Sequence, residues 1–162
     1  MRSIVRRLAV LALAPIAAVG IVAVASPAEA VTIAQLAKMQ SDVLAGTNAQ
    51  RVKYGCAPLR QDAKIAYAAR VQSNYMARTG TFSHVGGSGS TFITRIKAQG
   101  YNAPLAENIA YGYPTAAKVV AAWMASPGHR ANILNCKAKA AGVGVIFSTL
   151  GTPYYTEDFG SV

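Results

Sequence analysis

Hydrophobic residues recur with helical spacing between residues 31 and 80. One apolar stripe predicts a helix over residues 33–52, and Thr32 with Gln35 has the spacing of a capping box at its start. A second stripe predicts a helix over residues 62–79, with Gly80 placed to end it. The first stripe consists of Ile33, Leu36, Met39, Val43 and Leu44. Two long helices therefore open this part of the chain.

Two shorter helical segments follow in the middle of the chain. Residues 91–99 have helical character and are followed by a glycine. Thr115 can cap a further helix, which the Ser-Pro-Gly sequence at 126–128 ends. Between the second and third helices, residues 81–85 are short enough to be extended. After the third helix, residues 105–111 form an apolar run.

The end of the chain has the pattern of a β-hairpin. β-branched and aromatic residues predict strands over residues 142–147 and 154–159, joined by a turn at 151–153. Early helices followed by a late antiparallel hairpin are typical of an α+β fold. The absence of an internal repeat or a linker indicates one domain.

Residues 1–30 have a different composition. Three arginines precede an almost wholly apolar stretch over residues 8–25, and Ala28 and Ala30 form a small-x-small ending. This pattern predicts a secretory signal peptide cleaved after Ala30, which leaves residues 31–162 as the domain. The alternative is an uncleaved membrane anchor, since the stretch is about long enough to span a bilayer. The ending favours cleavage, after which no membrane span remains.

The chain after the leader is basic. Residues 31–162 contain 13 Lys or Arg and five Asp or Glu, which gives a net charge of +8. Such a charge favours anionic partners such as acidic lipids or cell-envelope polyanions. The basic residues are scattered singly, so no specific nucleic-acid site is predicted. A generally basic soluble surface is the simpler interpretation.

The chain contains two cysteines, Cys56 and Cys136. An even number of cysteines in an exported chain predicts a disulfide. The bond would close a loop of about 80 residues and stabilise the fold by about 4–5 kcal/mol in the chain-entropy model. The alternative is a pair of free thiols or metal ligands.

Three scarce titratable residues are the candidates for chemistry: His84, Glu107 and His129. Two imidazoles and a carboxylate could hold a zinc-like ion together with water, or act in general acid–base catalysis. Their spacing lacks the one-turn pattern of a helical zinc site. From the residues alone, a structural, hydrogen-bonded role is favoured for each histidine. Asn108 and Asn132 are candidate amides for bracing the loops around them.

Other catalytic patterns are weak or absent. The glycine-rich segment at 86–90 has no lysine and no preceding buried strand, so it does not predict a phosphate loop. Ser126 lies three residues before His129, but no nucleophile elbow surrounds it, and it is better explained as a helix end. The eight tyrosines could line an apolar groove, although half-buried packing is the commoner role.

Five motifs occur in an order that resembles the CAP superfamily, in its small secreted bacterial form. This superfamily comprises cysteine-rich secretory proteins, antigen 5 and pathogenesis-related 1 proteins, and its domain is also called SCP-like. The resemblance covers about residues 33–160. The motifs are Phe82-Ser-His84, Ala106-Glu-Asn-Ile-Ala110, Trp123–Leu134, Gly142-Val-Gly-Val145 and Tyr155–Gly160.

The resemblance implies an α-β-α three-layer sandwich with a central antiparallel sheet. It implies that His84, Glu107 and His129 meet in one cleft, with Asn108 and Asn132 beside them. It also implies that the two histidines can bind zinc or another divalent metal. A secreted protein, free or associated with the cell wall, is expected.

The chain departs from the family pattern at three places. The second glutamate of the family's His/Glu tetrad is missing, and Ser126 stands near its position. Val85 follows the first histidine where bacterial relatives often have an aspartate nearby, and Glu157 stands where glutamine is common. A site with fewer carboxylates has less negative charge to hold a metal and fewer groups for proton transfer.

The sequence leaves three functions open. The first is a secreted binding or interaction domain with a metal-binding cleft and an apolar groove for lipid or sterol. The second is a metal-assisted hydrolase of peptide or cell-envelope polymer, with Glu107 as the base. The third is a purely structural brace made by the two histidines and the glutamate. The ligand, the metal and the oligomeric state are not specified by the sequence.

Overall fold

The computed structural model describes residues 31–162, so the signal peptide expected over residues 1–30 lies outside the described part. Helices and strands alternate irregularly along this range. The helices are α1 (Ile33–Lys53), α2 (Ala63–Thr79), η1 (Gly87–Gly89, a 3₁₀ turn), α3 (Phe92–Ala98), α4 (Ala116–Ala125) and α5 (Pro127–Ile133). The strands are β1 (Arg60–Gln61), β2 (Pro104–Tyr111), β3 (Ala140–Phe147) and β4 (Pro153–Gly160). Over residues 31–162, none of the helices combines the length and apolarity needed to cross a membrane.

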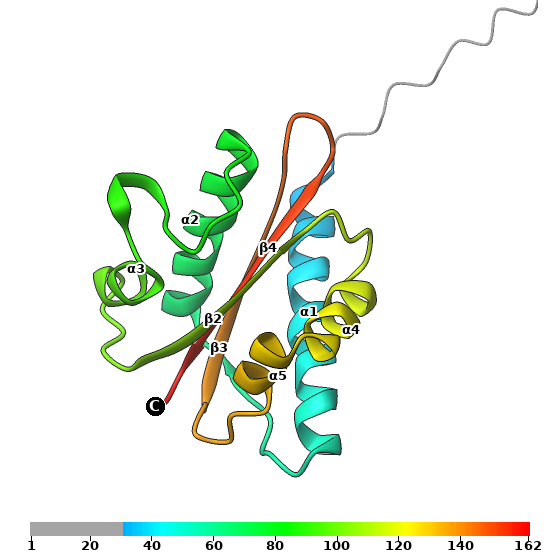
Figure 1. Ribbon diagram of the computed structural model, residues 1–162, viewed down its shortest axis with the longest axis vertical. Helices are drawn as coiled ribbons and strands as arrows, with labels where there is room; N and C mark the ends of the chain where they lie inside the picture. The colour runs from blue at the N-terminus through cyan, green and yellow to red at the C-terminus, as the bar shows by residue number, and fades with distance from the viewer. Residues whose placement is uncertain (1–30) are drawn as a thin grey trace, which may run out of the picture.

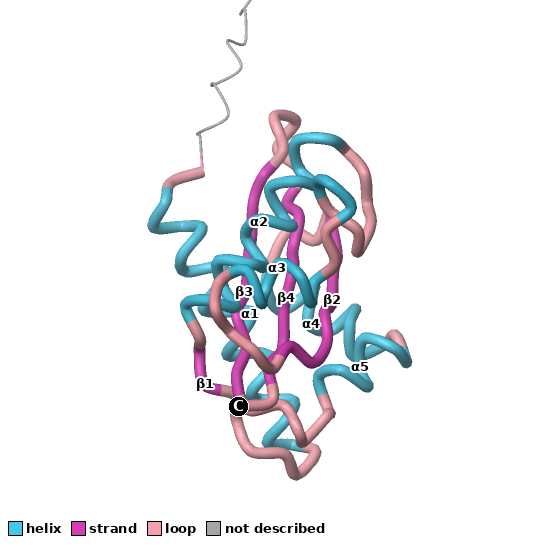
Figure 2. The backbone as a smooth tube through the Cα atoms, turned by 90° about the vertical axis from the view of Figure 1, so that its left-hand side faces the viewer, coloured by secondary structure: helices cyan, strands magenta, loops and turns pink. Residues whose placement is uncertain are grey.

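The sheet lies between two layers of helices. Its strands run in the order β1-β3-β4-β2, side by side in Figure 2. Helices α2 and α3 cover one face, and α1, α4 and α5 cover the other, as Figure 1 shows. The α+β class and the three-layer sandwich are confirmed. The sheet is mixed rather than wholly antiparallel, because the two-residue strand β1 pairs in parallel with β3.

Local sequence signals determine where the long helices begin and end. The Thr32 side chain accepts the Gln35 backbone N–H, and the Gln35 side chain accepts the Thr32 N–H, which completes the capping box of α1. Asp62 caps α2, and Gly80 ends it in the left-handed conformation with φ 71°. The predicted helices over 33–52, 62–79 and 91–99 agree with α1, α2 and α3 within one or two residues.

The larger hydrophobic core fills the space between the sheet and α1, α4 and α5. Trp123 is its largest fully buried side chain, and Tyr155 and Phe159 of β4 point into the same core. Burial of such aromatic side chains contributes about 1.5–3 kcal/mol each before entropy costs. This core fixes α4 and α5 against the sheet, and with them the residues that follow α4.

The opposite face of the sheet approaches α2 closely. A Cβ atom built on Gly142 would lie 2.0 Å from the Ala66 backbone nitrogen, and one on Gly144 would lie 2.5 Å from the Ala69 backbone. Only glycine permits this approach of helix and strand. The Gly-Val-Gly-Val motif thus sets the distance between these two layers.

The Cys56–Cys136 disulfide predicted from the sequence is confirmed, with 5.1 Å between its Cα atoms. Next to it, the fully buried Arg51 ties the end of α1 to two loops. Its guanidinium donates to four backbone carbonyls: Ala57 (3.0 Å), Ile133 (2.7 Å), Asn135 (2.9 Å) and Ala138 (3.0 Å). The segments around residues 51–57 and 133–138 are therefore held together by a covalent bond and, independently, by the hydrogen bonds of Arg51.

Two details differ from the sequence predictions. Pro127 and Gly128 do not form a turn; they are the first residues of α5, with proline near the helix start where its fixed φ fits and its missing N–H costs nothing. Residues 81–85 form a loop without strand pairing.

Candidate functional site

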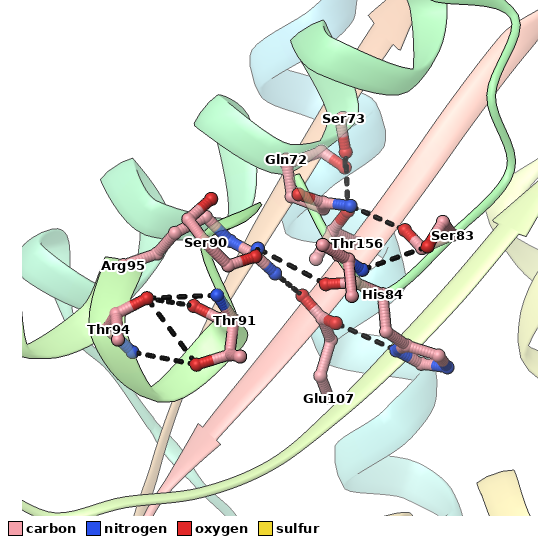
Figure 3. A network of polar contacts seen from close by, with 12 residues as sticks. Gln72, Ser73, Ser83, His84, Ser90, Thr91, Thr94, Arg95, Glu107 and Thr156 are labelled. Atoms are coloured by element: carbon pink, nitrogen blue, oxygen red, sulfur yellow. Dashed lines mark hydrogen bonds and ion pairs between the residues drawn. The ribbon is translucent and has the colours of Figure 1, made fainter. Parts of the chain in front are cut away.

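The centre of the candidate site is Glu107 on β2. Its side chain is buried, and its Oε1 atom lies 2.7 Å from Nδ1 of His84. His84 belongs to the loop between α2 and α3, and its side chain is 56% exposed. Figure 3 shows the imidazole extending from this bond away from the core. The glutamate thus fixes one ring nitrogen and leaves the other, Nε2, free to meet a ligand.

Arg95 of α3 holds the second carboxylate oxygen of Glu107. Its Nη2 atom lies 2.5 Å from Oε2, and both side chains are almost fully buried. Nη1 of the same guanidinium donates to the backbone carbonyls of His84 (3.2 Å) and Ser90 (2.8 Å). Arg95 therefore fixes both the glutamate and the loop that carries His84 (Figure 3). Its role is not predicted from the sequence, where Arg95 has the pattern of a surface residue on a short helix.

A second acidic residue lies directly across the sheet ladder from Glu107. Asp158 of β4 is the register partner of Glu107 and is fully buried. Burial, together with the neighbouring Glu107 carboxylate, raises the pKa of Asp158 well above its ordinary value. Both effects favour the neutral form of Asp158, which lies beside the Glu107 carboxylate that Arg95 and His84 bond.

His129 approaches from the other side of β2, on the first turn of α5. The Asn108 side chain donates to the His129 carbonyl (3.2 Å). The Asn132 side chain donates to the Glu107 carbonyl (3.3 Å) and to the Asn108 side-chain oxygen (2.8 Å). The two amides thus brace α5 against β2, and all five residues singled out in the sequence lie in one connected site.

β2 is an edge strand, and this explains how His84 and His129 come together. The His84 loop lies on the α2–α3 side of the sheet, and α5 lies on the opposite side. Burial lowers the pKa of His129, and the nearby His84 lowers it further. Both effects favour the neutral form of the His129 imidazole near pH 7.

Side chains also cover the backbone of this edge. Trp123 donates its indole N–H to the Ile109 carbonyl (3.2 Å), as Asn132 does to the Glu107 carbonyl (3.3 Å). Alternate residues of an edge strand point their backbone groups away from the sheet. Side chains of α4 and α5 therefore bond two carbonyls to which an added strand would otherwise donate its N–H groups.

A groove of about 480 Å³ runs along β2 and α4 to His129. We call it the β2–α4 groove. It is lined mainly by apolar and aromatic side chains: Phe82, Ile109, Ala110, Tyr111, Tyr113, Ala122, Trp123, Ser126 and His129. Of the eight tyrosines, Tyr111 and Tyr113 line this groove. The Phe82 and Tyr111 rings pack with their centroids 4.9 Å apart, which gives the groove a firm aromatic rim.

The residues present fit a weak metal site at most. Residues 31–162 contain no group of three or more His, Cys, Asp or Glu arranged to hold a metal ion. Glu107 is already bonded through both oxygens, so His84 and His129 are the two side chains left as ligands. A carboxylate-oriented imidazole and a neutral one are suitable ligands, with water completing the coordination.

Comparison with known proteins agrees with this architecture. The family model described as the cysteine-rich secretory protein family (CAP) matches residues 44–159. The uncharacterized protein YkwD of Bacillus subtilis is 40% identical over 103 residues, which cover 63% of this chain and 40% of YkwD. The uncharacterized membrane protein YlbC of the same organism is 35% identical over 121 residues, 74% of this chain and 34% of YlbC. The chain thus spans well under half the length of these two relatives.

Solved structures show the same fold. An extracellular SCP-domain protein from Bacillus anthracis superposes with a TM-score of 0.74 at 25% identity, over 85% of this chain and 45% of that one. An outer surface protein of Borrelia burgdorferi superposes with a TM-score of 0.69 at 21% identity, over 76% of this chain and 92% of that one. With the family match extending over most of the described residues, this chain belongs to the CAP family of cysteine-rich secretory proteins.

Proposed function

We propose that this CAP domain is an extracellular binding domain whose β2–α4 groove holds an elongated apolar ligand such as a lipid or a sterol. The observation that carries the proposal is the lining of the groove, which is aromatic and aliphatic along its length and has His129 among its few polar residues. Apolar walls with one or two polar groups are typical of sites for small apolar molecules. A neutral imidazole can bond a hydroxyl or carboxyl head group.

The disulfide and the relatives support an extracellular location. Disulfides persist in oxidising compartments, and Cys56–Cys136 is present in the fold. One structural relative is described as extracellular and another as an outer surface protein. A domain at the cell surface encounters envelope lipids, which are the ligand class that the groove fits.

A divalent metal belongs to the proposal as a second, weaker ligand. Nε2 of His84 and the imidazole of His129 would hold it, and Glu107 would orient His84 without contacting the ion. Such an ion would supply a positive charge at the end of the groove for an anionic head group. With two protein ligands, we expect weak binding of Zn²⁺.

The alternative of a metal-assisted hydrolase requires Glu107 to act as a base. Both of its oxygens are bonded, one to His84 and one to Arg95, and the side chain is 1% exposed. A general base must reach the proton that it removes. This geometry favours a positioning role for Glu107. The hydrolase alternative predicts turnover of peptide or envelope polymers that Glu107→Gln abolishes while the protein stays folded.

The groove is tested by filling it. The full chain is expressed, and the exported protein is titrated with dehydroergosterol and with a fluorescent fatty acid. Ala122→Phe places a ring in the groove and should weaken binding by about tenfold, or 1.4 kcal/mol. Ala117→Phe adds the same ring at an exposed position of α4 outside the groove and should leave binding unchanged. Equal affinities of the two variants, or no binding of either probe, would overturn the proposal.

The metal is tested separately by calorimetry with Zn²⁺ alone. His84→Ala and His129→Ala should each abolish the binding heat, because two ligands are needed. If both variants bind Zn²⁺ as the unchanged protein does, the two histidines are not the site. That result would leave the groove proposal intact, since Ala122→Phe tests the groove independently.

A further inference from the structure

The surface of the described residues is nearly free of unpaired acidic groups. Of the five Asp or Glu in residues 31–162, three are buried: Glu107, Glu157 and Asp158. The other two form ion pairs, Asp42 with Lys38 at 2.7 Å and Asp62 with Arg60 at 2.8 Å. Among the 13 Lys and Arg, only Arg51 and Arg95 are buried. Most cations on this surface therefore have no acidic partner.

Four of these cations gather at the end of the molecule that contains the disulfide. They come from the end of α1, from α5 and from the loop before β3, and all are exposed. The Cys56–Cys136 bond and the Arg51 hydrogen bonds hold these segments together, and Figure 1 shows both loops below the sheet. We call this surface the disulfide-end patch; it consists of Lys53, Tyr54, Arg130, Lys137 and Lys139.

The sequence around the patch contains no acid. Residues 43–61 and 108–156 lack Asp and Glu entirely. No carboxylate from these two segments offsets the positive potential of the patch, and over short distances such potential is screened mainly by salt. Elsewhere, as at Lys38 and Arg60, an adjacent carboxylate removes most of that potential.

Tyr54 organises two of the patch cations without neutralising them. The Arg130 guanidinium lies 5.0 Å from the centre of the Tyr54 ring, and the Lys53 ammonium lies 5.8 Å from it. A ring attracts a cation through its quadrupole but accepts none of its charge. Arg130 is thus held in place with its N–H donors available, an arrangement suited to phosphate groups.

We infer that the disulfide-end patch is a docking surface for a linear anionic polymer with repeating phosphodiester groups, such as a polyol-phosphate chain of a cell envelope. Separate cations on two covalently joined segments match charges repeated along a flexible chain. Single-stranded nucleic acid fits less well, because base stacking needs a row of free aromatic rings, and the patch has one ring, Tyr54, against which Arg130 already lies. A lipid surface fits less well, because Val52 is the one large aliphatic side chain exposed beside the patch.

The test measures binding of synthetic poly(glycerol phosphate) to the exported protein by fluorescence anisotropy at several salt concentrations. A triple variant, Lys53→Gln, Arg130→Gln and Lys137→Gln, should raise the Kd by about tenfold or more and reduce its salt dependence. The matched control removes three charges from α2 and α3, through Arg70→Gln, Arg78→Gln and Lys97→Gln. It should raise the Kd by less than about threefold.

A finer pair of variants tests the ring. Tyr54→Leu keeps every charge but releases Arg130, and should raise the Kd by about two- to threefold. Tyr67→Leu is its control, because Arg70 lies 5.6 Å from the Tyr67 ring on α2, away from the patch; it should leave the Kd unchanged.

Three outcomes would overturn the inference. The first is that the polymer does not bind, and the second is that the two triple variants weaken binding equally. The third is tighter binding of a single-stranded oligonucleotide or of phosphatidylglycerol vesicles than of the polymer. Thermal unfolding of each variant verifies that it is folded. The groove variant Ala122→Phe should bind the polymer normally, so this test and that of the groove can fail independently.

Discussion

Two buried arginines hold two loops of this molecule, but they do so with different partners. Arg51 bonds four backbone carbonyls, whereas Arg95 bonds two carbonyls and the carboxylate of Glu107. Carbonyls are fixed partners that belong to the fold. The carboxylate is shared with His84, an exposed side chain in the candidate site. Arg51 therefore stabilises the fold, whereas Arg95 positions His84, a residue that can contact a ligand.

Because their partners differ, removal of the two arginines should have different consequences. At the Arg51 end, the disulfide and the guanidinium restrain the same two segments, so their removal should lower stability without changing the order of His84. At the Arg95 end, removal of the guanidinium leaves Glu107 buried without its cation and releases the His84 loop. Its effect should appear both in stability and in the order of His84.

The largest effect is expected from Arg51→Met. The variant leaves two buried and two part-buried carbonyls without this donor and should lower the free energy of unfolding by about 4–6 kcal/mol. Urea denaturation measures the loss. Lys53→Met, at an exposed position of the same helix end, should cost less than about 0.5 kcal/mol. A loss below about 1 kcal/mol for Arg51→Met would show that water replaces the guanidinium easily.

Removal of the disulfide should follow closely. Cys56→Ser with Cys136→Ser opens a loop with a sequence separation of 80 residues, and the loss should be about 4 kcal/mol in the chain-entropy model. Chemical reduction of the unchanged protein provides the control and should give a similar loss. The double variant should keep the His84 side-chain NMR signals, because the Arg95 end does not depend on this bond. Altered His84 signals would contradict the separation of the two ends.

Arg95→Met tests the other end of the comparison. It leaves the Glu107 carboxylate buried beside Asp158 and should cost about 3 kcal/mol. Adding Glu107→Gln should restore part of this loss, because the unpaired charge is gone. The His84 NMR signals should broaden while those of His129 stay sharp. Lys97→Met, an exposed position on the same helix, is the control; if it changes His84 equally, Arg95 is not the positioning residue.

The last expected effect depends on pH and concerns Glu157, beside Arg51. Burial raises the pKa of Glu157 to about 8, although Thr47 donates a hydrogen bond to it and Arg51 acts in the opposite direction. The folded protein keeps this proton where the unfolded chain, with a carboxyl pKa near 4.5, releases it. The contribution of Glu157 to stability therefore falls as pH rises from about 4.5 to about 8 and is constant above that.

Glu157→Gln removes this dependence. Relative to the unchanged protein, it should alter stability little at pH 5 and increase it at pH 9, as measured by thermal unfolding. Asp42→Asn changes an exposed carboxylate and should show no such gain. A gain that is equal at pH 5 and pH 9 would mean that Glu157 is ionised throughout, with Arg51 as its effective partner.

The helices can be predicted because their signals are local. Asp62 and Gly80 mark the two ends of α2 in the sequence and in the structure. Strand β1 cannot be predicted, because two residues carry no pattern. Helix α5 escapes prediction because Pro127 indicates a break after α4, although proline is also favoured in the first turn of a helix.

The site can be predicted only in part, for a similar reason. His84, Glu107 and His129 stand out by scarcity, and the ordered motifs indicate that they meet. Arg51 and Arg95 carry no such signal. Each lies on a helix where a basic residue is usually exposed, and their partners come from segments up to 87 residues away. Long-range burial of this kind follows from the packing of layers, which local patterns do not describe.

The covered edge of β2 has a consequence for the behaviour of the protein at high concentration. Edge strands with free backbone groups are templates on which other chains can add strands and form fibrils. Here Trp123 and Asn132 donate to two carbonyls of β2. The opposite edge consists of the two-residue β1 and, beyond it, of β3, whose Gly144 carbonyl accepts a hydrogen bond from Ser73 of α2. An incoming strand at β2 would have to displace the side chains of Trp123 and Asn132. Resistance to edge-to-edge aggregation is thus built into the same helices that form the wall of the groove.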